Sequence, residues 1–194
     1  MNLIEASTYA EKILGCKWVK WIHRGTNPAK TAQEKNLNVI RSAINPKHCA
    51  ICLNMNGCCF VKNNCPENPF HYNCHCYYEN IDMVTTQTTS TIDKFTNYLF
   101  SATLSKGKKD LFEKWGYSVS DSFSLKEEFE KQAQLAYQSG DYKLGEQTVH
   151  GQRINIAIRL KRKNSQQYVL FKTGWMTYPN GKLQLITPYG GKIE

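Results

Sequence analysis

The clearest regularity in the chain is an alternation of apolar and polar side chains over residues 152–160. Ile154, Ile156, Ile158 and Leu160 occupy every second position, and arginine, asparagine and alanine stand between them. Successive side chains of a β-strand point to opposite faces of a sheet. The pattern therefore predicts a strand with one buried face.

Two more strands are predicted downstream, at residues 167–175 and 182–187. The turn between them contains Pro179, which fixes φ, and Gly181, which adopts positive φ without strain. We therefore expect an antiparallel sheet of three to four strands. The side chains expected at its buried interface are Ile154, Ile156, Ile158, Val169, Phe171 and Leu185 from the sheet, and Trp115 and Phe129 from the helices.

Helical periodicity precedes these strands in three segments. The first covers residues 92–99, and the second ends at Gly116, which is suited to the left-handed position after a helix. The third is predicted to begin at Ser124, where Glu127 completes a capping box, and to end near Gly140. Helices followed by a sheet indicate an α+β fold.

The chain divides into two predicted domains. Residues 82–91 are rich in threonine and nearly uncharged, which predicts an extended linker. A small helical, zinc-ribbon-like module would then occupy residues 1–81, with helices at 2–14 and 31–44 and cysteines in loops. The α+β domain would occupy residues 92–194.

The chain is basic, and its charge is uneven. Its 194 residues carry a net charge of +9, and residues 151–194 alone carry +7. This balance favours a polyanionic partner, above all RNA. No apolar run is long enough to cross a membrane, and the N-terminus lacks the apolar core of a secretory signal. We expect a cytoplasmic protein or one carried in a phage virion.

Seven of the eight cysteines cluster between residues 49 and 76. A Cys-x-x-Cys pair is followed after eighteen residues by His-x-x-Cys, and such paired turns suit a structural, tetrahedral Zn²⁺ site. Buried thiols or disulfides are the alternative. The predicted ligands are Cys49, Cys52, His71 and Cys74, with Cys65 and Cys76 as alternates.

The cysteine region resembles the C-terminal signature of phage Mu F-like minor head proteins over residues 38–80. The matching segments are CAIC, NGCCF and PENPFHYNCHC. Tyr72 and His75 depart from that signature, which has proline and arginine there. The resemblance implies a phage origin and a delivery or docking role for this module.

Residues 92–190 resemble an uncharacterised domain found at the C-termini of phage head proteins and polymorphic toxins. The resemblance rests on the segments DKFTNYLF, KGKKDLFEKWGYS, HGQRINIAIRL and VLFKTGWMTYPNGKLQLITPYGG. The order of helices and strands is also similar to the compact ribonuclease fold of barnase-like and RelE-like toxins. These resemblances imply a toxin-like effector, with an immunity protein or a phage head protein as a further partner.

RNA cleavage by transesterification needs a base, an acid and cations at the phosphate, but no metal. The candidate catalytic residues are His150, Arg153 and Thr187. His150 is the only histidine after the predicted linker. An ordinary surface histidine is the alternative reading of His150.

Several lysines and arginines are candidates for contacts with nucleic acid. Lys106, Lys108 and Lys109 flank a glycine before a predicted helix, where backbone amides could hold a phosphate. A solvated surface is the alternative for these and for the basic hairpin tip. The full set is Lys106, Lys108, Lys109, Arg159, Lys161, Arg162, Lys163 and Lys172.

Two functions remain open from the sequence. The first is a phage-derived, toxin-like effector whose basic C-terminal domain binds RNA and cleaves it as a metal-independent ribonuclease. The second is a non-enzymatic phage minor head protein that binds DNA or a head partner.

Overall fold

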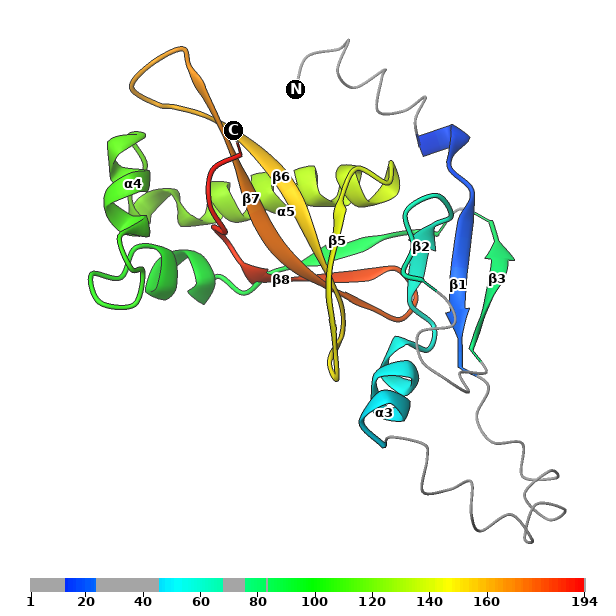
Figure 1. Ribbon diagram of the computed structural model, residues 1–194. Helices are drawn as coiled ribbons and strands as arrows, with labels where there is room; N and C mark the ends of the chain where they lie inside the picture. Colours follow the sequence, from blue (N-terminus) through cyan, green and yellow to red (C-terminus); the bar gives the residue numbers. More distant parts are fainter. Residues whose placement is uncertain (1–12, 24–45, 68–75, 83, 194) are drawn as a thin grey trace, which may run out of the picture.

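The computed structural model describes residues 13–23, 46–67, 76–82 and 84–193 (Figure 1). The chain contains helices and two β-sheets, which confirms the α+β class. One sheet has the strand order β2-β1-β3 and the other β4-β8-β7-β6-β5. Within the described ranges, no helix has the length and apolar character needed to cross a bilayer.

The elements of the first sheet and its helix are β1 (Trp18–Ile22), α3 (Pro46–Met55), β2 (Cys59–Val61) and β3 (Tyr77–Ile81). The strands of the second sheet are β4 (Gln87–Thr89), β5 (Lys143–Thr148), β6 (Gly151–Lys161), β7 (Tyr168–Tyr178) and β8 (Lys182–Thr187). Its helical segments are the π-helix η2 (Lys94–Leu99), α4 (Lys108–Lys114), the 3-10 helix η3 (Val119–Asp121) and α5 (Ser122–Gln138).

The centre of the five-stranded sheet follows the predicted pattern. β6 and β7 form a long antiparallel pair in which Ile156 lies opposite Thr173. β7 and β8 are joined at the predicted turn, where Asn180 and Gly181 both have positive φ, of 60° and 73°. Two central residues with positive φ are typical of a type I′ hairpin turn, whose twist matches that of the strands.

The sheet is larger than predicted, and it is not purely antiparallel. β4 lies within residues 82–91, the predicted linker, and pairs with β8 in parallel. β5 adds the other edge through antiparallel pairing with β6. The alternation rule missed both strands because β4 has three residues and β5 contains a register shift between Leu144 and Gln147.

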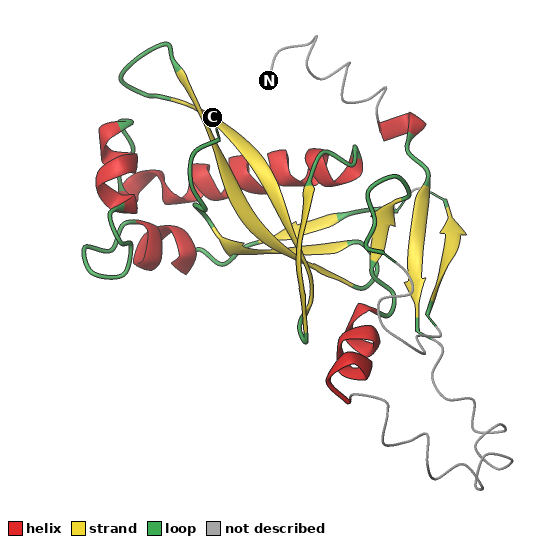
Figure 2. Cartoon of the chain, viewed as in Figure 1, coloured by secondary structure: helices red, strands yellow, loops and turns green. Residues whose placement is uncertain are grey.

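The helices cover one face of this sheet, as Figure 2 shows for α5. The predicted core is confirmed, because all eight of its side chains are at most 9% exposed. At its centre Phe171 of β7 stacks on Trp115, with ring centroids 5.6 Å apart. Phe129 of α5 lies 5.7 Å from the same Phe171 ring, so helix and sheet are joined through aromatic contacts.

Two helix boundaries can be compared with their predictions. Gly116 follows α4 with φ of 88°, as expected for a residue after a helix C-terminus. The start of α5 was predicted wrongly, because Ser124 lies inside the helix and Ser118 with Asp121 forms the capping box one turn earlier. The hydroxyl of Ser124 instead donates to the carbonyl of Asp121.

The N-terminal part contains more regular structure than predicted. The Cys-x-x-Cys pair lies on helix α3, not in a loop. The three-stranded sheet was also not predicted. The predicted helix at 31–44 lies outside the described residues, as does most of that at 2–14.

The two parts of the chain pack on one continuous core. Trp18 of β1 meets Tyr137 of α5 edge to face at 5.6 Å, and Val61 belongs to the same buried cluster. The Tyr142 hydroxyl donates to the carbonyl of Asn64 and accepts from the amide of Val61. The N-terminal part therefore contributes to the core of the larger domain.

Candidate anion-binding pocket

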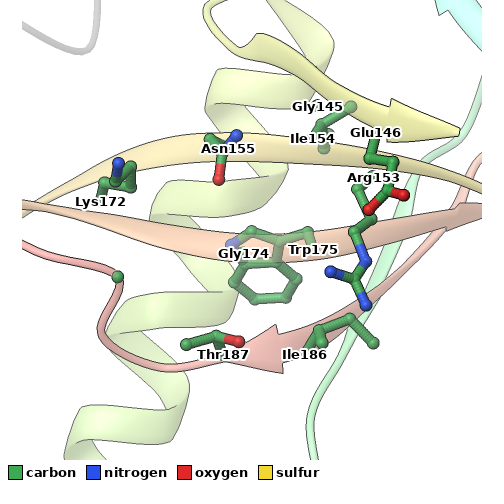
Figure 3. A pocket seen from close by; sticks show the side chains of 11 residues that line it. Gly145, Glu146, Arg153, Ile154, Asn155, Lys172, Gly174, Trp175, Ile186 and Thr187 are labelled. Atoms are coloured by element: carbon green, nitrogen blue, oxygen red, sulfur yellow. The ribbon is translucent and has the colours of Figure 1, made fainter.

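A pocket of about 290 Å³ opens on the face of the five-stranded sheet opposite α5 (Figure 3). β6, β7 and β8 contribute most of its lining, and β5 closes one side. The lining residues are Gly145, Glu146, Arg153, Ile154, Asn155, Lys172, Gly174, Trp175, Ile186, Thr187 and Gly190.

Strand register explains why polar groups gather here. Arg153 and Asn155 occupy the positions of β6 that alternate with buried isoleucines, so both point away from the core. Gly174 lies opposite Asn155 on one side and opposite Thr187 on the other. Because Gly174 has no side chain, the middle of the pocket floor stays open.

The charged groups lie at the two ends of the pocket. Figure 3 shows Lys172 at one end, and Arg153 with the carboxylate of Glu146 at the other. Arg153 and Lys172 are exposed, and neither forms an ion pair with a carboxylate of the described residues. The guanidinium and the ammonium group are therefore available to anions.

The three predicted catalytic residues are only partly brought together. Arg153 and Thr187 both line the pocket, but His150 does not. His150 is exposed in the turn between β5 and β6, where its backbone amide donates to the Thr148 hydroxyl at 3.1 Å.

Lys106, Lys108 and Lys109 do not lie at the pocket. Lys108 donates to the Tyr98 hydroxyl at 3.0 Å, and Lys109 lies 3.8 Å from Glu113. Their contacts hold the start of α4, a helix of only seven residues.

The predicted basic tip is the loop between β6 and β7, and it packs on the end of α4. Lys163 forms an ion pair with Asp121, and its backbone amide donates to the carbonyl of Trp115. Arg162 donates to the side chain of Gln167. These two cations already have partners within the protein.

Lys172, Arg159 and Lys161 differ from the tip because they lie on the open face of the sheet. Lys172 lines the pocket, and Arg159 stacks over the ring of Tyr168 at 4.0 Å. Lys161 is exposed at the end of β6, opposite Tyr168. Together they extend the basic surface from the pocket toward the hairpin.

The predicted zinc ligands lie in the N-terminal part. Cys52 on α3 and Cys76 before β3 are buried, whereas His71 and Cys74 lie outside the described residues. Among the described residues, no three His, Cys, Asp or Glu side chains form a group that could hold a metal ion. Cys65 donates to the carbonyl of Lys62 at 3.3 Å.

Cys58 and Cys59 belong to the core. Burial raises the pKa of the Cys58 thiol to about 12, so this thiol stays protonated at neutral pH. Burial also raises the pKa of Cys59. Both side chains are part of the packed interior, with exposed fractions of 0% for Cys58 and 2% for Cys59.

Residues 81–192 match a family described as Domain of unknown function (DUF6883). The chain belongs to this family. The matched region begins at the last residue of β3 and includes every later helix and strand, so it contains all residues that line the pocket. No curated protein and no solved structure matches the chain.

Sequence reasoning missed Glu146, Asn155 and Gly174. Asn155 could have been found, because it follows Arg153 by two positions and therefore points to the same, outward face of the predicted strand. Glu146 gave no signal, because β5 was not predicted and its register shift sets the direction of that side chain.

Proposed function

We propose that the chain is a toxin-like effector of phage origin whose DUF6883 domain binds RNA across the open face of its sheet. The proposal rests above all on Arg153 and Lys172, two cations without a carboxylate partner among the described residues, at opposite ends of one pocket. The phage origin and the effector role rest on the sequence resemblances described above.

The open face has the composition of a surface that binds single strands. Its basic residues on β6, β7 and β8 are Arg153, Arg159, Lys161, Lys172 and Lys182. Cations that neutralise phosphates release counterions, which favours binding without any need for a specific sequence. Tyr168, with Arg159 above its ring, offers a platform on which a base can stack.

The pocket fits a short stretch of RNA backbone better than an isolated phosphate. Lys172 lies opposite Ala157 of β6, which is four positions from Arg153. The attachment points of the two cations are therefore about 13 Å apart along the strand direction. One phosphate would contact Arg153, and another, further along the same strand, would contact Lys172. The Asn155 amide and the Thr187 hydroxyl lie between them and can bond sugar or phosphate oxygens.

The end that holds Arg153 also contains the groups for cleavage. The Glu146 carboxylate would take the proton of a ribose 2′-hydroxyl, and the 2′ oxygen would attack phosphorus. The 5′ oxygen would leave with a proton from water, giving a 2′,3′-cyclic phosphate. Arg153 would stabilise the added negative charge of the transition state. Because His150 does not line the pocket, this proposal assigns the base to Glu146.

Fluorescence anisotropy of the full chain with a labelled single-stranded RNA tests the binding. Arg153→Ala and Lys172→Ala should each weaken binding about tenfold, or about 1.4 kcal/mol. Each should also lower the slope of log K against log salt by about 0.7 to 1. Lys109→Ala and Lys163→Ala are matched controls, because both cations already have carboxylate partners.

Cleavage of an end-labelled RNA without added metal tests the chemistry. Glu146→Gln should slow cleavage by roughly 10²-fold or more while leaving binding intact. Arg153→Ala should lower kcat, and Lys172→Ala should mainly raise KM. Binding without cleavage would favour the phage structural protein, and equal effects of all four lysine and arginine variants would contradict the pocket.

A further inference from the structure

A β-bulge in β5 lies beside the Arg153 end of the pocket. The pairing of β5 with β6 shifts between Leu144 and Gln147. Gly145 and Glu146 therefore both face one residue of β6, Arg153. An extra residue of this kind bends a strand and changes the direction of its side chains. The bulge is thus the feature that turns Glu146 toward Arg153, as Figure 3 shows.

The side chain of Gln152 connects this bulge to β6. Gln152 is 1% exposed. Its Nε2 atom donates to the carbonyl of Gly145 at 2.8 Å and to the carbonyl of Arg153 at 2.6 Å. Both acceptors are backbone carbonyls, so these two bonds use both protons of the amide group. One side chain therefore fastens the bulged segment of β5 to the facing backbone of β6.

Gly145 lets the two strands approach closely at the bulge. A Cβ atom at this position would lie 3.3 Å from the Cβ atom and from the carbonyl oxygen of Arg153, and 3.4 Å from the Nδ2 atom of Asn155. The first two distances are shorter than an ordinary van der Waals contact. A larger residue would therefore push the bulge, and Glu146 with it, away from β6.

We propose that Gln152 is a positioning residue that holds Glu146 beside Arg153 by fastening the bulge of β5. The inference rests on the proposed function, in which Glu146 is the base and Arg153 stabilises the transition state. A base must lie within hydrogen-bond reach of the proton that it removes, and a displacement of about 1 Å can slow a reaction about 10²-fold. Gln152 does not line the pocket, so it acts only through the backbone that carries Glu146.

A double-mutant cycle in the full chain tests this role. Gln152→Met keeps the approximate size of the side chain but removes both donors. The kcat of RNA cleavage should therefore fall about tenfold or more, while KM and RNA affinity stay unchanged. In the Glu146→Gln background the same substitution should have no further effect on kcat, because the base is already absent. Losses that simply add would overturn the proposal.

Thr177→Val is the matched control for a lost hydrogen bond. The Thr177 hydroxyl donates to the backbone carbonyl of Gln152 at 3.2 Å, and this bond is buried and does not involve the bulge. The control should lower the melting temperature and leave kcat unchanged. Gly145→Ala shifts the bulge without altering Gln152, so it should lower kcat severalfold even if Gln152→Met fails to fold. An unchanged kcat in Gly145→Ala, or an equal loss in Thr177→Val, would contradict the role.

Hydrogen exchange along β5 separates this inference from the proposed chemistry. Amides of residues 144–147 should exchange faster in Gln152→Met than in the unmodified chain, and at the unmodified rate in Thr177→Val. Unchanged exchange in Gln152→Met would overturn the positioning role even if the chain cleaves RNA. If the unmodified chain does not cleave RNA, the proposed chemistry fails, and faster exchange in Gln152→Met still supports Gln152 as the residue that holds Glu146 in place.

Discussion

The two faces of the five-stranded sheet differ in almost every chemical respect, although they alternate along the same strands. Ile156, Ile158 and Phe171 are fully buried against the helices, and Arg153 and Lys172 are exposed on the other side. The buried face is filled by aromatic rings, and the open face holds a pocket floored by a glycine. Stability and the proposed binding are therefore assigned to opposite faces.

This separation has a practical consequence for mutagenesis. Neighbouring residues of one strand should give opposite phenotypes, because a shift of one position moves a side chain to the other face. Loss of stability and loss of binding can thus be measured in variants that differ by a single step along β7.

The largest effect is expected for Phe171→Ala. This side chain is fully buried and contacts Trp115 and Phe129, so its removal leaves a cavity. The free energy of unfolding should fall by about 3 to 5 kcal/mol. Leu170→Ala, on the open face at 43% exposure, should change it by less than about 0.5 kcal/mol. Urea unfolding of both variants checks this, and equal losses would contradict the assignment of faces.

A smaller effect is expected for a buried hydroxyl. Thr173 Oγ1 donates to the carbonyl of Ile156 at 2.9 Å and accepts from Trp175 Nε1 at 2.8 Å. Thr173→Val removes both hydrogen bonds from the core and should cost about 1 to 3 kcal/mol. Thr187→Val lies in the pocket and should leave thermal unfolding nearly unchanged. A similar fall in melting temperature for both would show that the pocket face also carries stability.

The Lys163–Asp121 pair should contribute about 0.2 to 1 kcal/mol. The hydrogen bond from Lys163, helped by the amide of Ser118, holds the pKa of Asp121 below its ordinary 3.8. The stabilisation by the ion pair is complete above pH 3.8, the ordinary pKa, and is lost as the pH falls through the lower pKa that Asp121 has in the folded state. Asp121→Asn should therefore destabilise the chain at pH 7 and flatten the acid slope in urea unfolding. An unchanged slope would exclude the pair as its source.

The smallest change in stability is expected for Lys172→Ala. The ammonium group makes no ion pair with the described residues, so unfolding should change by less than about 0.5 kcal/mol. The same variant should lose RNA affinity, as proposed above. A variant that loses stability and affinity together would show that the two faces are coupled.

Sequence alone identified the buried face of the large sheet with good accuracy. The alternation in β6 and the Asn180–Gly181 turn are local signals, since a strand repeats every two residues and a turn needs only four. All eight predicted core side chains are buried. Much less of the pocket was predicted, because only Arg153, Lys172 and Thr187 were candidates and His150 lies elsewhere.

The N-terminal part shows the limit of local patterns. The sequence indicated that the cysteines belong together, but it could not show that His23 meets Cys76, 53 residues later. That contact depends on the pairing of β1 with β3, which is fixed by the burial of Trp18, Val19 and Trp21 against distant elements.

Local periodicity thus determined which side chains of β6 and β7 are buried, together with the basic character of their outer face. Tertiary structure alone decided that β5 brings Glu146 beside Arg153, that Gly174 leaves room between Asn155 and Thr187, and that β4 forms an edge strand. The physical reason is that strand order, register shifts and cross-strand neighbours depend on contacts between residues far apart in the chain.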